Sequence, residues 1–149
     1  MKPADNPFTG AARACVLYSL HRAVRAADQV YDAAFRKVGL RATQVFLLNA
    51  IEARAPVTLG DLARGIVVDR TTLTRNIQPL LKAGLVSVRA GQDRRVREIS
   101  ITAAGRRRVR QAYPLWRQSQ EFLAGRLGAA AVADLLGHLR GIVAITRER

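Results

Sequence analysis

Apolar residues change their spacing twice along this chain, and this limits the folds that it can adopt. From Leu17 to Val38 they recur every three or four residues, which is typical of one face of a helix. Between Leu85 and Ile101 they alternate with polar residues, as in a half-buried strand, and after Thr102 the helical spacing returns. We therefore expect a mainly α fold with one small β-hairpin.

Two helices are predicted in the first third of the chain. The first covers residues 11–38 and ends at Gly39-Leu40, because glycine tolerates the left-handed backbone past a helix end. A shorter helix runs from Thr43 to about Arg54 and is closed by Pro56. The first helix has a coiled-coil-like apolar seam made of Leu17, Leu20, Val24, Ala27, Tyr31, Ala34 and Val38.

Two further helices each begin with a capping residue. Thr58 and Asp61 form a capping pair for a helix that ends at Arg64, and residues 65–68 are the turn after it. Asp69 caps the next helix, which buries Leu73, Ile77, Leu80 and Leu81 and ends at Gly84. Its opposite face has no acid after the cap and consists of Arg70, Thr71, Thr74, Arg75, Gln78 and Lys82. A solvated face usually mixes charges, so this face indicates a binding surface. Pro79 predicts a bend late in the helix.

A hairpin and two helices complete the chain. The hairpin has a polar, basic tip at residues 90–95, and its strands carry Leu85, Val86, Val88, Val96, Ile99 and Ile101. Thr102 caps a helix that contains four arginines in residues 106–110, and Pro114 is expected to bend or divide it. Gly128 precedes the last helix, whose predicted buried face consists of Val132, Leu135, Leu136, Leu139, Ile142 and Val143.

Length and composition narrow the class of protein. A chain of 149 residues is one domain, or one domain with an extension, and can bury a core without disulfide or metal support. A lone cysteine, Cys15, cannot form an internal disulfide, and no metal-ligand cluster is present. The apolar stretches are shorter than the ~20 residues of a membrane span, and residues 1–9 lack the apolar run of a signal peptide. We expect a cytoplasmic protein with no cofactor.

The net charge of +14 indicates the partner once it is placed along the chain. Arginine outnumbers lysine 22 to 3, which GC-rich coding alone would also produce. However, residues 57–110 hold twelve basic and four acidic residues, so a net +8 lies in about a third of the chain. Because phosphates neutralised by these cations release counterions, the local excess favours nucleic acid.

Two capped helices followed by a hairpin predict a winged helix-turn-helix, whose second helix enters the major groove of DNA. Arginine can form a pair of hydrogen bonds with guanine, glutamine can do so with adenine, and the threonine methyl can contact the thymine methyl. At the hairpin tip Asp93 is placed to hold the guanidinium of Arg95, and an arginine on such a wing fits the minor groove. The predicted DNA-binding residues are Arg70, Thr71, Thr72, Thr74, Arg75, Gln78, Asp93, Arg94 and Arg95.

Four short motifs occur together in this segment. They are Asp69-Arg70-Thr71-Thr72-Leu73-Thr74-Arg75, Leu80-Leu81-Lys82-Ala83-Gly84-Leu85-Val86, Asp93-Arg94-Arg95 and Ile101-Thr102-Ala103-Ala104-Gly105. In these motifs the chain resembles the MarR family of bacterial transcription regulators. The resemblance implies a repressor that reads a palindromic operator as a homodimer and is released by a small-molecule effector. It divides the chain into an N-terminal helical part (1–54), a winged helix-turn-helix (55–105) and C-terminal helices (106–149) that complete the dimerisation region.

The resemblance also implies that a signal controls DNA binding, and two kinds of signal are compatible with the sequence. Regulators of this family commonly respond to small phenolic or aromatic acids, or to oxidation of a cysteine in the first helix. Cys15 falls about two residues before the reactive cysteine of the family's hydroperoxide sensors; one activating tyrosine is matched by Tyr31, and the other falls at Ala42 and is missing. For an acid, the candidate contacts are His21, Arg25 and Trp116, with Arg13, Arg22 and Tyr113 as further ones.

Other classes fit less well. No Gly-rich phosphate loop, nucleophile motif or carboxylate pair is present, so we do not expect an enzyme. A non-specific basic nucleic-acid-binding protein is compatible with the charge, but aromatic residues make up 5% of the chain and none lies in the recognition helix. We therefore predict a sequence-specific DNA-binding regulator, with redox sensing through Cys15 and non-specific binding as the alternatives.

Overall fold

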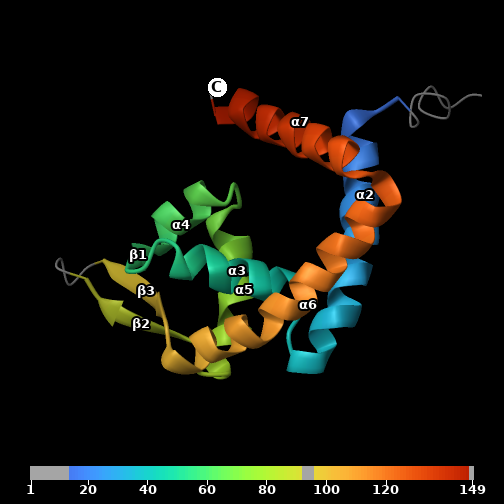
Figure 1. Cartoon of the computed structure of the whole chain (residues 1–149). Helices are drawn as coiled ribbons and strands as arrows, with labels where there is room; N and C mark the ends of the chain where they lie inside the picture. Colours follow the sequence, from blue (N-terminus) through green and yellow to red (C-terminus); the bar gives the residue numbers. More distant parts are fainter. Residues whose placement is uncertain (1–13, 92–95, 148–149) are drawn as a thin grey trace, which may run out of the picture.

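The structure, a computed structural model, describes residues 14–91 and 96–147 (Figure 1). A group of short helices with a small sheet forms one side of the molecule, and the long helices α2, α6 and α7 form the other. The mainly α fold with a hairpin is confirmed. In chain order the elements are α2 (Val16–Phe35), the 3-10 helix η2 (Arg36–Val38), α3 (Ala42–Glu52), β1 (Val57–Thr58), α4 (Leu59–Gly65), α5 (Arg70–Lys82), β2 (Val86–Ala90), β3 (Arg97–Ile101), α6 (Ala103–Leu127) and α7 (Ala129–Arg147).

One hydrophobic core lies between α3, α4, α5 and the sheet. The apolar face predicted for α5 is confirmed, because Leu73, Ile77 and Leu80 are buried and Leu81 is half-buried. Full burial of one such side chain stabilises the fold by about 1.5–3 kcal/mol. The largest fully buried side chains are Leu48, Ile51, Leu62, Leu73, Leu80 and Ile99.

The sheet has the strand order β1-β3-β2, and both pairs are antiparallel. β2 and β3 are the predicted hairpin, in which Val88 lies opposite Ile99 and the Gly91 N–H donates to the Val96 carbonyl over 2.8 Å. β1 was not predicted, because a strand of two residues is too short to show alternation. Its Val57 pairs with Ile99, so α4, which follows directly, is tied to the wing.

Thr102 fixes the start of α6 to the hairpin. Its hydroxyl accepts a hydrogen bond from the Gly105 N–H over 3.0 Å, which confirms the predicted cap, and donates to the Gly84 carbonyl over 2.8 Å. A Cβ on Gly105 would lie 2.1 Å from the Leu85 carbonyl oxygen. The helix and the hairpin therefore approach each other more closely than a residue with a side chain allows.

The two prolines within helices do not divide them. α6 remains one helix of 25 residues through Pro114, so of the two expected outcomes, a bend or a division, the division does not occur. Figure 1 shows the helix curving along its length. The packing of α6 against α2 and α3 offsets the missing backbone hydrogen bond. α5 likewise continues past Pro79 to Lys82, and the bend expected at Pro79 stays a prediction.

The first helix starts later than predicted. Cys15 has an extended backbone (φ −78°, ψ 115°) and precedes α2, while residues 11–13 of the predicted helix lie outside the described residues. Residues 14–19 are exposed, so little burial is available to stabilise a further turn there. At the other end Gly39 has the expected left-handed backbone (φ 65°). α3 begins at Ala42, one residue earlier than predicted, since its N–H donates to Asp32 Oδ1 over 2.6 Å.

The predicted buried face of α7 is largely exposed in the described chain. Val132 and Leu139 are half-buried, whereas Leu135, Leu136, Ile142 and Val143 are 36–48% exposed. The prediction is wrong for a single chain because α7 turns away from α6 at Gly128 by 107° and leaves the core (Figure 1).

Within residues 14–91 and 96–147, no single helix is long and apolar enough to cross a membrane. α6 and α7 meet that requirement only as a sharply bent pair.

Candidate nucleic-acid interface

Asp69 sets the start of α5. Its Oδ1 accepts a hydrogen bond from the Thr72 backbone N–H over 2.8 Å, which confirms the predicted N-cap. Hydrogen bonds from the Thr72 hydroxyl, and then from the same N–H, hold the pKa of Asp69 below its usual range. The cap is therefore charged at neutral pH, where it also complements the positive end of the helix dipole.

One face of α5 is open to solvent along its length. Every residue predicted on this helix to contact DNA is exposed, namely Arg70, Thr71, Thr72, Thr74, Arg75 and Gln78. The Thr74 hydroxyl donates to the Arg70 carbonyl over 2.7 Å, so in the free protein it is already bonded. The remaining predicted contacts, Asp93, Arg94 and Arg95, lie outside the described residues.

The turn between α4 and α5 depends on an unusual backbone at Val67. The Val68 N–H donates to the Ala63 carbonyl over 3.0 Å and the Val67 N–H to the Arg64 carbonyl over 3.4 Å, which is the pattern of a Schellman motif. Val67 occupies the left-handed position of this motif, with φ 56°, where glycine is usual. A β-branched side chain is strained there. The turn over residues 65–68 was predicted, but Val67 stands where a glycine would mark the left-handed position.

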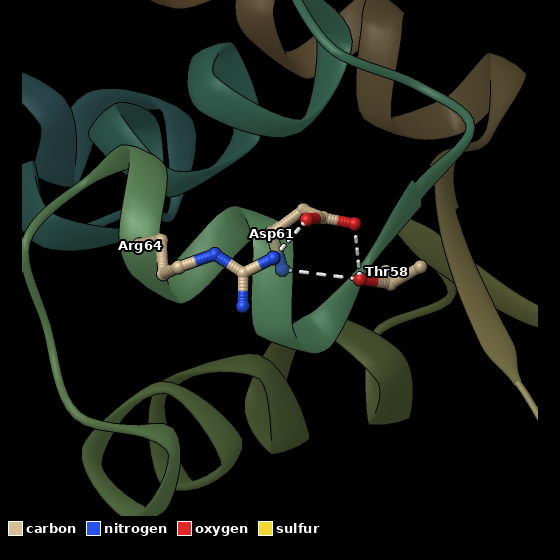
Figure 2. A network of polar contacts seen from close by, with 3 residues as sticks. All are labelled: Thr58, Asp61 and Arg64. Carbon is tan, nitrogen blue, oxygen red and sulfur yellow. Dashed lines mark hydrogen bonds and ion pairs between the residues drawn. The ribbon is translucent and has the colours of Figure 1, made fainter.

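A network of three polar side chains fixes the outer face of α4 (Figure 2). Thr58 caps the helix by accepting from the Asp61 N–H over 3.0 Å, and its hydroxyl donates to Asp61 Oδ2 over 2.6 Å. Asp61 Oδ1 in turn accepts a hydrogen bond from Arg64 Nη2. The Thr58 hydroxyl, and then the Arg64 guanidinium, hold the pKa of Asp61 below its usual range. The carboxylate is thus ionised at neutral pH and keeps Arg64 in place.

An open groove of about 1370 Å³ runs between the helix-turn-helix and the base of the wing. Of the residues along it, only Arg70 was among the predicted contacts; Arg64, Arg97 and Gly60 were not. No local sequence pattern indicates them, because the groove forms only where α4, α5 and β3 meet. It is lined by Thr58, Leu59, Gly60, Ala63, Arg64, Gly65, Val67, Val68, Asp69, Arg70, Val96 and Arg97.

The candidate effector residues are not gathered in one pocket. Trp116 is 38% exposed and stacks on Tyr113, with 5.6 Å between the ring centroids. His21 and Arg25 are exposed on α2 and do not line the cavity beside Trp116. That cavity of about 250 Å³ lies between α3 and α6 and is lined by Val45, Asn49, Val109, Ala112, Tyr113 and Trp116.

Cys15 is a free, exposed thiol at the start of α2. Tyr31 is on the same helix, but sixteen residues separate it from Cys15, which is ~24 Å along a helix axis. Within one chain Tyr31 therefore does not touch Cys15. The exposure of the thiol is compatible with oxidation, and its reactivity stays a prediction.

Capped α4 and α5, the tight turn between them and the β2–β3 wing define a winged helix-turn-helix DNA-binding protein. The family model of the MarR family matches residues 38–96. Together with the similarities described next, this match shows that the chain belongs to the MarR family of DNA-binding transcription regulators.

Solved structures resemble the chain over most of its length. The M. tuberculosis transcriptional regulator MosR in complex with DNA is 38% identical, with a TM-score of 0.76 over 89% of this chain and 98% of that one. Another crystal structure of MosR is 36% identical, with a TM-score of 0.74 over 88% and 96%. Bordetella bronchiseptica BpsR, whose DNA binding is regulated by 6-hydroxynicotinic acid, shares the fold at 24% identity, with a TM-score of 0.77 over 87% and 93%. A comparison with curated proteins finds no match.

Proposed function

We propose that this chain represses transcription by binding a palindromic operator through the exposed face of α5. The proposal rests on that face, which has six exposed side chains with hydrogen-bonding capacity and no acidic residue after Asp69. Arginine and glutamine on such a helix can hold guanine and adenine edges in the major groove. The wing residues Asp93, Arg94 and Arg95 complete the proposed interface. MosR, a regulator with 38% identity, has been crystallised with DNA, which supports DNA as the partner.

We propose that the chain acts as a homodimer, held by α2 and α7. Exposed apolar residues of this kind usually mark a protein interface. They include Val16, Leu17 and Val24 on α2 and Leu135, Leu136 and Ile142 on α7. A two-fold dimer would present two α5 helices to half-sites about one helical turn apart, roughly 34–36 Å. By this proposal residues 55–105 read the DNA, while residues 1–54 and 106–149 assemble the dimer.

The test is selection of bound duplexes from a random DNA pool. We expect a palindrome with half-sites about one helical turn apart. Arg75→Ala or Gln78→Ala should then cost about 1–3 kcal/mol of binding and relax specificity at one position of each half-site. Equal affinity of the native protein for selected and random duplexes would instead favour the non-specific alternative.

For the effector we propose a small aromatic acid in the cavity beside Trp116. The cavity of about 250 Å³ has an apolar wall and an aromatic pair on which a ring can stack. Trp116 is the one tryptophan in the chain, so its fluorescence reports the site directly. Titration with benzoate-like acids should change this fluorescence and release operator over the same concentration range. Release without a fluorescence change would place the effector elsewhere, for example at His21 and Arg25.

Redox control through Cys15 remains the second candidate, favoured by the exposure of the thiol. Treatment with an organic hydroperoxide should weaken operator binding by the native protein and leave Cys15→Ser unchanged. If the native protein keeps its affinity, this alternative fails. In either case we propose a cytoplasmic regulator, associated with the nucleoid when bound, and no catalytic activity.

A further inference from the structure

Two arginines from different helices converge above Gly60. Gly60 is the second residue of α4, Arg64 lies one turn later, and Arg70 is the first residue of α5. A Cβ on Gly60 would be 3.7 Å from Arg64 Nη1 and 3.9 Å from Arg70 Nη2. It would also be 3.8 Å from the Thr58 hydroxyl oxygen. The two guanidinium groups therefore both come within 4 Å of one point, next to a hydroxyl and the half-buried backbone of Gly60.

This arrangement favours an anion. Two cations brought together repel each other unless a negative charge lies between them. Arg64 is held from one side, since its Nη2 binds Asp61, and Figure 2 shows its other terminal nitrogen pointing away from that carboxylate. Asp69, the acid nearest to Arg70 in sequence, is occupied by the Thr72 N–H. A phosphate oxygen accepts charge-assisted hydrogen bonds from such groups at about 2.7–2.9 Å.

The absence of a side chain on Gly60 lets such an oxygen approach the backbone closely. Its backbone has no left-handed conformation that demands glycine, and glycine inside a helix costs about 1 kcal/mol relative to alanine. A glycine between two guanidinium groups is compatible with the close approach of a ligand to the backbone.

We propose that Arg64 and Arg70 together clamp one phosphate of the DNA backbone above Gly60. The proposal rests on the DNA binding proposed above. It gives the predicted contact Arg70 a phosphate as its partner and adds Arg64, which is outside the predicted set, as a positioning residue. The occupant is a phosphodiester because the clamp lies along the open groove between the first turn of α5 and β3, the two elements that flank bound DNA. A phosphate contact fixes the position of the protein and carries no sequence information.

The test measures affinity for selected and random duplexes at several salt concentrations, by fluorescence anisotropy. Arg64→Gln and Arg70→Gln should each weaken binding to both duplexes by the same factor, roughly tenfold. Each should also lower the slope of log affinity against log salt by about 0.9, the value for one phosphate. Because both arginines hold the same phosphate, the double variant should lose about 0.9 as well. Arg117→Gln is the matched control, since Arg117 is also exposed and paired with an acid on its own helix, Glu121. It should leave the slope unchanged.

Three outcomes overturn the clamp. Arg64→Gln has the slope of the native protein, or the double variant loses twice the single value, as two separate phosphates would require. In the third, inorganic phosphate without DNA raises the unfolding temperature of the native protein but not of Arg64→Gln, while the two proteins bind both duplexes with equal affinity, which would assign the site to a free anion. Equal native affinity for the selected and random duplexes would instead contradict sequence-specific regulation and leave the salt slopes able to test the clamp.

Discussion

The winged part of the molecule and its helical arms use apolar residues in opposite ways. By the arms we mean residues 16–25 of α2, together with α7. In the winged part Leu48, Leu62 and Leu80 are fully buried among α3, α4, α5 and the sheet. In the arms Leu17 is 63% exposed and Leu136 is 48% exposed. The winged part completes its core within one chain, whereas the arms leave their apolar faces exposed in one chain, as the proposed dimer requires.

The largest expected effect is the loss of stability when a leucine of the winged part, rather than one of the arms, is replaced by alanine. Leu48→Ala should lower the free energy of unfolding by about 2–5 kcal/mol at any protein concentration, since it leaves a cavity in a closed core. Leu136→Ala should destabilise only at concentrations that populate the dimer, and its effect should vanish on dilution. Urea unfolding at two concentrations measures both. If Leu136→Ala lowers the free energy of unfolding of the monomer as much as Leu48→Ala does, the apolar residues of the arms and of the winged part do not differ in this way.

A second prediction concerns the close approach of α6 to the hairpin. Gly105→Ala should destabilise by about 1–3 kcal/mol or more, because the new Cβ would meet the Leu85 carbonyl oxygen. Gly125→Ala is the control, in the same helix but with no atom within 4 Å of the added Cβ. It should stabilise by about 0.5–1 kcal/mol through helix propensity. Thermal unfolding at one fixed concentration distinguishes the two signs.

A smaller effect is expected at the turn between α4 and α5. Val67→Gly should stabilise by roughly 0.5–1 kcal/mol, since relief of the left-handed strain exceeds the entropy lost by glycine on folding. Gln118→Gly, at an exposed position inside α6, should instead destabilise by about 1 kcal/mol. A loss of stability in both variants would contradict the strain at Val67.

The smallest expected effect is a dependence on pH at the two caps. The folded-state pKa values of Asp61 and Asp69 are lowered by their hydrogen bonds. Their contribution to stability is therefore complete above the unfolded pKa of about 3.9, and is lost as the pH falls through the lower folded values. The stability difference between the native protein and Asp69→Ala should shrink between pH 5 and pH 2. A difference that stays constant over this range would show that the charge of Asp69 does not contribute.

Much of the fold and of the interface followed from residues close together in sequence. The caps at Thr58, Asp69 and Thr102 were all predicted, because a cap depends on residues three positions apart. The exposed face of α5 was predicted from the spacing of its apolar residues. In contrast, the sequence did not show that α6 continues through Pro114 or that one chain leaves most of the predicted buried face of α7 exposed, since both depend on what packs against a helix.

The sequence by itself determined the helices, the hairpin, their caps and the concentration of positive charge on the winged part. These features arise from spacing and from contacts within a few residues, which a linear pattern records. Only the tertiary structure decided that β1 joins the sheet, that Val67 is left-handed, and that Arg64 and Arg70 meet above Gly60. It also decided which apolar faces one chain leaves exposed. Each of these depends on elements that are brought together only when the core closes, so no local pattern contains it.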